Sequence, residues 1–166
     1  LLELLKLLDD EQTDPDVAMG SWAGALGQCQ FMPSNVRRYA IDWDGDGRRD
    51  IWRSTGDVLA STANFLSHLG WRDDQTWGRR VLLPAEFDER LAGREVQMRL
   101  GRWQALGVRR LNGQSLPKRK LWTTLLLPDG RDGRAFLVYE DFKVLLRWNN
   151  SIHFAVSVGH LSERLR

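Results

Sequence analysis

The chain has 166 residues, of which 42% are hydrophobic, and 24 basic residues stand against 22 acidic ones. This length is enough for one hydrophobic core and a small subdomain. A net charge of +2 gives no strong field for a polyanion, so the basic clusters Arg109–Arg110 and Lys118–Lys120 are expected to be solvated surface rather than a nucleic-acid site. No apolar run reaches the roughly 20 residues of a membrane span, and the single Cys29, interpreted as a small buried hydrophobe, excludes an internal disulfide.

The first part of the chain is predicted to alternate helices and loops. Residues 1–8 have the leucine pattern of an amphipathic helix, which the segment around Pro15 ends. Pro33 favours the start of a second helix. Ser54, with a carboxylate three residues later, has the spacing of a helix cap, and the apolar stripe that follows is closed by Gly70.

The middle of the chain changes to short β-prone runs separated by turn residues. The runs are residues 95–100, 120–127 and 135–139. They predict a small antiparallel subdomain over residues 81–139. From Phe142 the helical pattern returns, with an interruption at residues 149–151, so residues 140–166 are expected to form a C-terminal helical segment.

An acidic loop carries the strongest chemical signal in the sequence. Its candidate ligands are the carboxylates of Asp42, Asp44, Asp46 and Asp50 at positions 1, 3, 5 and 9 of an EF-hand-type loop, and the Arg48 carbonyl at position 7. Gly47 occupies the sharp turn at position 6. Crowded carboxylates repel one another, and oxygen ligands at this spacing favour Ca²⁺ over a transition metal. The loop is single, so a structural ion is favoured over a sensor.

Position 12 of the loop departs from this pattern, because Arg53 stands where a bidentate Glu is usual. Asp57, at the start of the next helix, is the candidate for the missing carboxylate. The alternative is a turn without metal, in which Arg48, Arg49 and Arg53 neutralise the aspartates.

The segment Gly20–Ser34 contains three glycines, Gly20, Gly24 and Gly27, that allow close approach of backbone or ligand. It is not a phosphate loop, because no Gly-Lys-Ser/Thr follows. From spacing alone it is a tightly packed turn.

Residues 20–34 and the acidic loop together resemble the calcium-binding, B-type membrane-bound lytic murein transglycosylases of bacteria. A third segment, Leu146–Ala155, is similar to that family's Arg-Tyr-Asn-x-Ser-x-x-Tyr-Ala stretch. The resemblance implies an α+β fold, with a mainly helical lysozyme-like core and an inserted antiparallel β subdomain. The expected domains are residues 1–80 with the calcium loop, 81–139 with the strands, and 140–166 returning to the core.

The resemblance also implies the residues that face the glycan. They are Ser21, Gln30, Phe65, Trp148, Asn149 and Phe154. At three of these positions, 65, 148 and 154, an aromatic without a phenol replaces the family's Tyr, so stacking on sugars is expected to persist while hydroxyl contacts are lost. Most of the eight tryptophans, Trp52 and Trp71 included, are expected in the core.

The implied activity is cleavage of the MurNAc–GlcNAc β-1,4 bond of peptidoglycan without water, giving 1,6-anhydromuropeptides. One Glu carries this chemistry in the family, and no residue here is assigned to it: Glu3 and Glu11 have no recognisable catalytic context. We therefore expect the chain to be the downstream part of a longer protein and to be inactive alone. The alternative is a non-catalytic, calcium-stabilised glycan-binding module. The expected setting is the periplasm or the outer-membrane-associated envelope, with peptidoglycan strands as partner and a monomeric chain.

Overall fold

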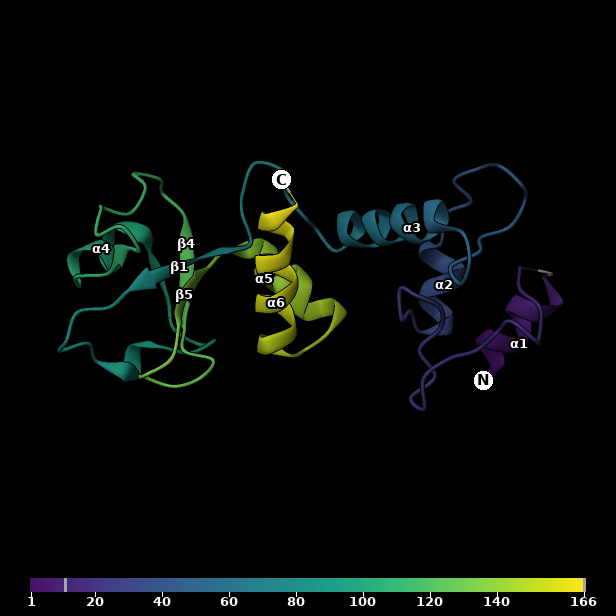
Figure 1. Ribbon diagram of the computed structural model, residues 1–166, viewed down its shortest axis with the longest axis horizontal. Coiled ribbons are helices and arrows are strands. Elements are labelled where there is room, and N and C mark those ends of the chain that lie inside the picture. The colour runs from purple at the N-terminus through teal and green to yellow at the C-terminus, as the bar shows by residue number, and fades with distance from the viewer. Residues whose placement is uncertain (11, 166) are drawn as a thin grey trace. The chain divides into compact units, whose positions relative to one another are not determined.

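The computed structural model describes residues 1–10 and 12–165, and the chain folds as two compact units, Leu1–Leu69 and Gly70–Arg166 (Figure 1). Glu11 lies outside the described residues. The first unit is made of helices and loops, and the second contains the sheet. None of the described helices is long and apolar enough to cross a membrane.

Three helices form the first unit: α1 (Leu2–Asp9), α2 (Pro33–Tyr39) and α3 (Thr55–His68) (Figure 1). Pro33 occupies the first turn of α2, where its missing N–H costs nothing. The hydroxyl of Ser54 caps α3 by accepting a hydrogen bond from the Asp57 amide, as the sequence predicts.

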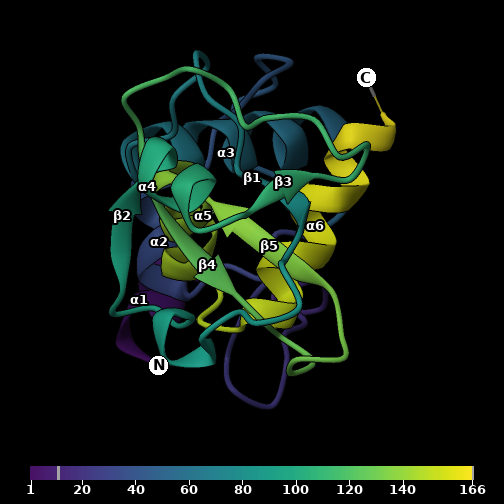
Figure 2. The same ribbon diagram turned by 90° about the vertical axis from the view of Figure 1, so that its left-hand side faces the viewer.

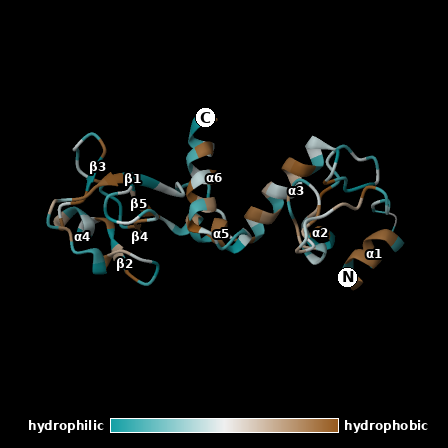
Figure 3. Cartoon of the chain, turned by 60° about the horizontal axis from the view of Figure 1, so that its bottom comes forward, coloured by the Kyte–Doolittle hydropathy of each residue, from teal (hydrophilic) through white to brown (hydrophobic). Residues whose placement is uncertain are grey.

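Aromatic rings form the centre of the first unit. Phe65 contacts Phe31 and Tyr39, with ring centroids 4.9 and 5.0 Å apart respectively. Helix α1 is hydrophobic over most of its length (Figure 3), and it buries Leu7 while Leu2 and Leu5 stay exposed.

Five antiparallel strands form the sheet of the second unit, in the order β2-β4-β5-β1-β3. The strands are β1 (Gly78–Leu82), β2 (Gln97–Arg99), β3 (Arg109–Arg110), β4 (Trp122–Leu126) and β5 (Ala135–Val138). The helical elements are η1 (Glu89–Leu91), α4 (Leu100–Ala105), α5 (Glu140–Trp148) and α6 (Ile152–Arg164).

Both faces of the sheet are covered, since α4 lies on one side and α5 and α6 lie on the other (Figure 2). Side chains alternate between faces along a strand. On the α4 side Leu137 joins a buried cluster with Trp103, while Phe136 contacts Trp77, whose ring also contacts Phe142 of α5.

The structure corrects parts of the sequence interpretation. β1 begins at Gly78, before the predicted start of the β subdomain, and neither α4 nor the two-residue β3 was expected. Residues 140–166 group with the sheet in one compact unit; the domain boundaries expected at residues 80 and 140 stay a prediction.

The expectation that most tryptophans are core residues is wrong. Of the eight, Trp77 and Trp103 are buried, Trp22, Trp43 and Trp122 are exposed, and Trp52, Trp71 and Trp148 are half-buried. Trp is large and has a polar N–H, so a partly exposed position is ordinary for it.

Candidate functional site

The acidic loop between α2 and α3 brings three carboxylates together. One oxygen from each of Asp42, Asp44 and Asp57 lies within 4.8 Å of the others. Asp42 and Asp44 come from the loop, and Asp57 comes from the first turn of α3. Asp57, the candidate for the missing carboxylate, therefore lies in this cluster, and its role as a metal ligand stays a prediction.

Asp57 holds the two ends of the loop, and it is 1% exposed. Its Oδ1 accepts a hydrogen bond from the Trp43 amide at 2.9 Å, and its Oδ2 accepts one from the Asp50 amide at 2.7 Å. A carboxylate in the first helical turn is also stabilised by the helix dipole. The loop conformation thus depends on a residue of the following helix.

The oxygens of Asp46 and Asp50, like those of Asp42 and Asp44, accept hydrogen bonds from amides of their own turns. Asp46 accepts from the Arg48 amide at 2.8 Å, and Asp50 accepts from the amides of Trp52 and Arg53 at 2.9 Å. Neither belongs to the three-carboxylate cluster. Their role as ligands, and that of the Arg48 carbonyl, stays a prediction.

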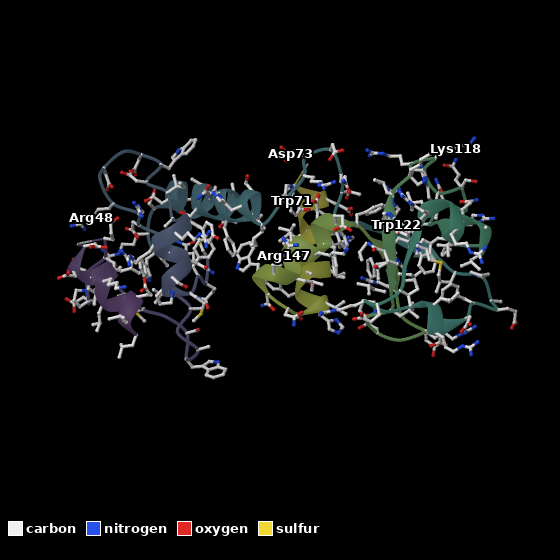
Figure 4. All side chains as sticks on the ribbon, turned by 180° about the vertical axis from the view of Figure 1, so that it is seen from behind. Arg48, Trp71, Asp73, Lys118, Trp122 and Arg147 are labelled. Carbon is white, nitrogen blue, oxygen red and sulfur yellow. The ribbon has the colours of Figure 1, made fainter. Side chains whose placement is uncertain are left out.

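The metal-free alternative requires Arg48, Arg49 and Arg53 to neutralise the aspartates of the loop. Among the described residues, no ion pair joins Arg48, Arg49 or Arg53 to an aspartate of the loop. Arg49 instead donates to the Arg37 carbonyl, and Arg48 extends away from the loop at the surface (Figure 4). In the part of the chain that the structure describes, no Lys or Arg side chain forms an ion pair with a carboxylate of the cluster.

A hollow of about 380 Å³ in the first unit contains two of the predicted glycan-facing residues, Ser21 and Gln30. Met19, Gly20, Gly27, Gln28 and Trp52 complete its lining. The sequence placed Ser21 and Gln30 nine positions apart; the turn between them brings both to one concave surface.

Tight turns build this hollow. The Ser21 hydroxyl accepts a hydrogen bond from the Ala25 amide, which holds the side chain in place. Gln30 has a φ of +52°, a left-handed conformation that is rare for a residue with a Cβ. The nitrogen of its side-chain amide donates to the Gly27 carbonyl at 2.9 Å. Such conformations cost free energy and persist only where surrounding contacts hold them, and they are frequent at binding sites.

Trp52 is a residue of the hollow that the sequence interpretation missed. Its indole N–H donates to the Met19 carbonyl, and its own carbonyl accepts from the Gln28 side chain at 2.8 Å. Trp52 occupies position 11 of the acidic loop. The acidic loop therefore positions one wall of the hollow. Neither the acidic loop nor the segment Gly20–Ser34 indicates this connection in the sequence.

In the second unit the junction of α5 and α6 carries the remaining predicted residues. The rings of Trp148 and Phe154 meet edge to face, with centroids 6.3 Å apart. Asn149 ends α5 and is exposed, and Ser151 caps α6 by accepting from the Phe154 amide. These three residues and the Ser21–Gln30 pair belong to different units; their convergence on one groove stays a prediction.

Phe65 differs from the other predicted site residues because it is only 4% exposed. Its ring contacts Phe31 and Tyr39 in the core of the first unit. The structure shows this packing role, and a contact with sugar at position 65 stays a prediction.

The carboxyl groups differ in their environment. Hydrogen bonds from Lys6 and Arg37 lower the pKa of Glu3, so it stays ionised and is a poor proton donor. Burial raises the pKa of Asp141, whose Oδ1 accepts a hydrogen bond from the Arg72 amide. Sequence reasoning missed Asp141, since no local pattern signals its burial.

Four further glutamates lie at the surface or in ion pairs. Glu86 and Glu95 are exposed. Glu89 pairs with Arg131 at 3.2 Å, and Glu140 pairs with Lys143 at 2.7 Å. Burial raises the pKa of the Cys29 thiol, which keeps it in the protonated, unreactive form.

A lysozyme-like α+β protein with an acidic loop and a polar hollow is thus the class that the architecture and these sites define. The family described as "Transglycosylase SLT domain" matches residues 1–163, and the chain belongs to this family. It is 31% identical over 160 residues to membrane-bound lytic murein transglycosylase B of Escherichia coli K12, covering 96% of this chain and 43% of that protein.

Solved structures agree with this assignment. SltB3 of Pseudomonas aeruginosa, in complex with NAG-anhNAM-pentapeptide, is 48% identical with a TM-score of 0.91, over 96% of this chain and 43% of that one. Slt35 of Escherichia coli, in complex with calcium, is 29% identical with a TM-score of 0.76, over 97% and 50%. The expected fold class is therefore confirmed, and the chain spans about half the length of these relatives or less.

Proposed function

We propose that this chain is part of a lytic murein transglycosylase, which cleaves the MurNAc–GlcNAc β-1,4 bond and leaves 1,6-anhydromuropeptides. The observation that carries the proposal is the family match over residues 1–163, together with the 48% identity to SltB3, whose structure holds a NAG-anhNAM-pentapeptide. The hollow with Ser21 and Gln30 supports it, because it offers a hydroxyl and an amide on a concave surface.

The site residues divide into polar and aromatic contacts. Ser21, Gln30 and Asn149 supply hydrogen-bonding groups for sugar hydroxyls and N-acetyl groups. Trp148 and Phe154 supply ring faces that stack on the apolar faces of pyranose rings. Trp148→Ala is expected to weaken binding of an N-acetylated glycan by about 1–3 kcal/mol. Trp122→Ala, on an exposed position of the sheet, is the matched control.

In the proposed reaction, one Glu protonates the glycosidic oxygen and then removes the proton of the C6 hydroxyl, which closes the anhydro ring on C1. General acid help is typically worth about 10²–10⁴-fold. We propose that this Glu lies outside the present 166 residues. The ionised setting of Glu3, the ion pairs of Glu89 and Glu140, and the burial of Asp141 support this view.

Mass spectrometry of isolated murein sacculi tests the activity. Sacculi are incubated with this chain, and with a longer polypeptide that also contains the preceding part of the protein. Anhydromuropeptides are expected from the longer polypeptide, and they should vanish when its candidate Glu becomes Gln. Anhydro products from the 166-residue chain alone would show that one of its own carboxylates is the acid.

We further propose that the acidic loop binds a structural Ca²⁺. Asp42, Asp44 and Asp57 already place three hard oxygen donors together, a set that fits Ca²⁺. Asp46, Asp50 and the Arg48 carbonyl complete the proposed ligand set. The ion would hold the loop against α3, and through Trp52 it would steady one wall of the hollow.

Thermal unfolding with excess calcium and with chelator tests the ion. An ion that binds the folded state stabilises it by about 2.7 kcal/mol at one hundred times its dissociation constant. Asp44→Ala and Asp46→Ala should abolish the difference, whereas Asp16→Ala, outside the loop, should keep it. Identical melting curves with calcium and chelator would show that the loop is only a turn.

The alternative function is a non-catalytic, calcium-stabilised glycan-binding module. It predicts glycan binding without anhydro products from any length of the protein. We place either activity in the bacterial periplasm or at the outer membrane, because the relative from Escherichia coli is membrane-bound. A monomeric state is proposed as well, and light scattering of the purified chain tests it.

A further inference from the structure

The second unit holds a large local excess of positive charge. Residues 96–128 contain no Asp or Glu, and their cations are Arg99, Arg102, Arg109, Arg110, Lys118, Arg119 and Lys120. The whole chain has 24 basic and 22 acidic residues, so everything outside this segment carries 17 basic against 22 acidic. The near-neutral total therefore conceals a segregated cationic surface.

Four of these cations line one hollow of about 430 Å³ beside α4. They are Arg99, Lys118, Arg119 and Lys120, and Leu116 and Pro117 add an apolar floor. The lining contains no acidic residue. Arg119 lies 3.8 Å from Asp74, while Arg99, Lys118 and Lys120 have no carboxylate within ion-pair distance among the described residues. A surplus of unneutralised cations in a concave site attracts an anion.

The walls of this hollow are held in place. Gln104 accepts a hydrogen bond from the Leu116 amide at 2.7 Å and donates to the Ser115 hydroxyl, which fixes the loop against α4. The guanidinium of Arg99 lies 4.4 Å from the centre of the Trp122 ring and donates to the Lys120 carbonyl. A preorganised site loses less entropy when a ligand binds.

Lys118 stands at the outer edge of the loop with its side chain directed into solvent (Figure 4). Residues of α4 and of the segment 116–120 line the hollow, whereas Trp148 and Phe154 belong to α5 and α6. In the ribbon, α4 lies on the other side of the sheet from α5 and α6 (Figure 2). The hollow is therefore a separate site from the aromatic pair of the proposed glycan groove.

We propose that this cationic hollow binds the carboxylates of a peptidoglycan stem peptide. The proposal rests on the proposed function, because murein supplies the anion: the ligand in SltB3 ends in a pentapeptide, and a peptide ends in a carboxylate. A concave site with an apolar floor fits a peptide carboxylate with its neighbouring methyl or methylene groups better than a flat anionic bilayer. Arginine and lysine donors form strong, charge-assisted hydrogen bonds with such groups.

Calorimetric titration tests the hollow with three probes: NAG-NAM-pentapeptide, the same disaccharide without peptide, and the free pentapeptide. The variant combines Lys118→Glu with Lys120→Glu, and its matched control combines Arg80→Glu with Arg134→Glu, two exposed cations outside the hollow. All proteins are first checked for equal melting temperature. If the variant melts lower, Lys118→Ala replaces it.

The lysine variant is expected to lose about tenfold or more in affinity for both peptide-bearing probes. The control pair should lose less than about twofold, and added salt should weaken peptide binding. Equal losses in variant and control, or no binding of free pentapeptide to the parent chain, would overturn the proposal. Lysine-dependent binding to phosphatidylglycerol vesicles without peptide binding would overturn it too, by assigning the surface to a membrane.

Failure of the proposed function has a different signature. In that case the peptide-free disaccharide would bind no protein in the set, while the free pentapeptide would still distinguish the lysine variant from its control.

Discussion

The two units of this chain are held together by different means. Among the described residues, eight buried hydrophobic ones lie in Leu1–Leu69 and eighteen in Gly70–Arg166. In the first unit, aspartate side chains accept hydrogen bonds from backbone amides of the loops and so hold these loops in place. The second unit is built around a five-stranded sheet with both faces covered. The stability of the first unit should therefore depend on calcium and on the hydrogen bonds of its turns, and the stability of the second unit on the volume of its core.

The stability of the second unit should fall most when volume is removed from its core. Trp103 is 0% exposed, and its indole N–H donates to the Thr123 carbonyl. Trp103→Ala is expected to cost about 3–5 kcal/mol of unfolding free energy, measured by urea denaturation. Trp122→Ala, at a position 48% exposed, should cost less than about 1 kcal/mol. Equal costs would mean that the sheet core does not dominate.

The corresponding weak point of the first unit is polar. Asp57→Ala removes the acceptor of the Trp43 and Asp50 amides, and hydrogen bonds to a charged group are worth about 1.5–3 kcal/mol. We expect a loss of about 2–3 kcal/mol, together with loss of the calcium response in thermal unfolding. Asp57→Asn, which keeps one acceptor oxygen, should fall between the parent and the alanine variant. A calcium response that survives in Asp57→Ala would remove Asp57 from the ligand set.

A pair of glycines tests how far backbone geometry maintains the hollow. Gly27 has a φ of +60°, and a Cβ there would lie 2.6 Å from the Ile51 carbonyl oxygen. Gly24 has a φ of +85° with nothing within 4 Å. Gly27→Ala should cost about 2 kcal/mol or more, and Gly24→Ala about 1 kcal/mol, in chemical denaturation. A smaller cost at position 27 than at 24 would contradict the importance of this contact.

The smallest expected effect is a gain in stability from Asp141, the buried acid of the second unit. Burial raises its pKa in the folded protein, so ionisation opposes folding. The penalty is absent below the pKa of Asp in the unfolded chain, about 3.9. It develops as the pH rises from there to the pKa of Asp141 in the folded protein, and it is complete above that pKa. Asp141→Asn keeps the acceptor for the Arg72 amide and should stabilise by about 1 kcal/mol at pH 7 and negligibly at pH 3.

Melting curves at the two pH values check this prediction, with Asp73→Asn at an exposed position as control. A variant that is less stable than the parent at pH 7 would show that the charged carboxylate itself holds the loop at Arg72.

Much of the fold was predictable because its signals are local. The Ser54 cap, Pro33 at the start of α2 and the break between α5 and α6 act over a few residues, and all three are found in the structure. In contrast, α4 was missed because its six residues follow a strand without a break, and Trp52 was assigned to the core because composition cannot distinguish a buried ring from one that lines a hollow.

Short motifs with fixed spacing were enough to indicate the family, the acidic loop and the candidate site residues from the sequence alone. Which of the candidate carboxylates lie together depends on the fold: Asp57 joins Asp42 and Asp44 because α3 carries its carboxylate back to the loop. Only the tertiary structure likewise gathered Arg99 and Lys118–Lys120 around one hollow, because strand register and the Gln104 hydrogen bonds set that contact. The excess of cations in residues 96–128 is visible in the sequence, but the fold decides which of these cations line the same hollow.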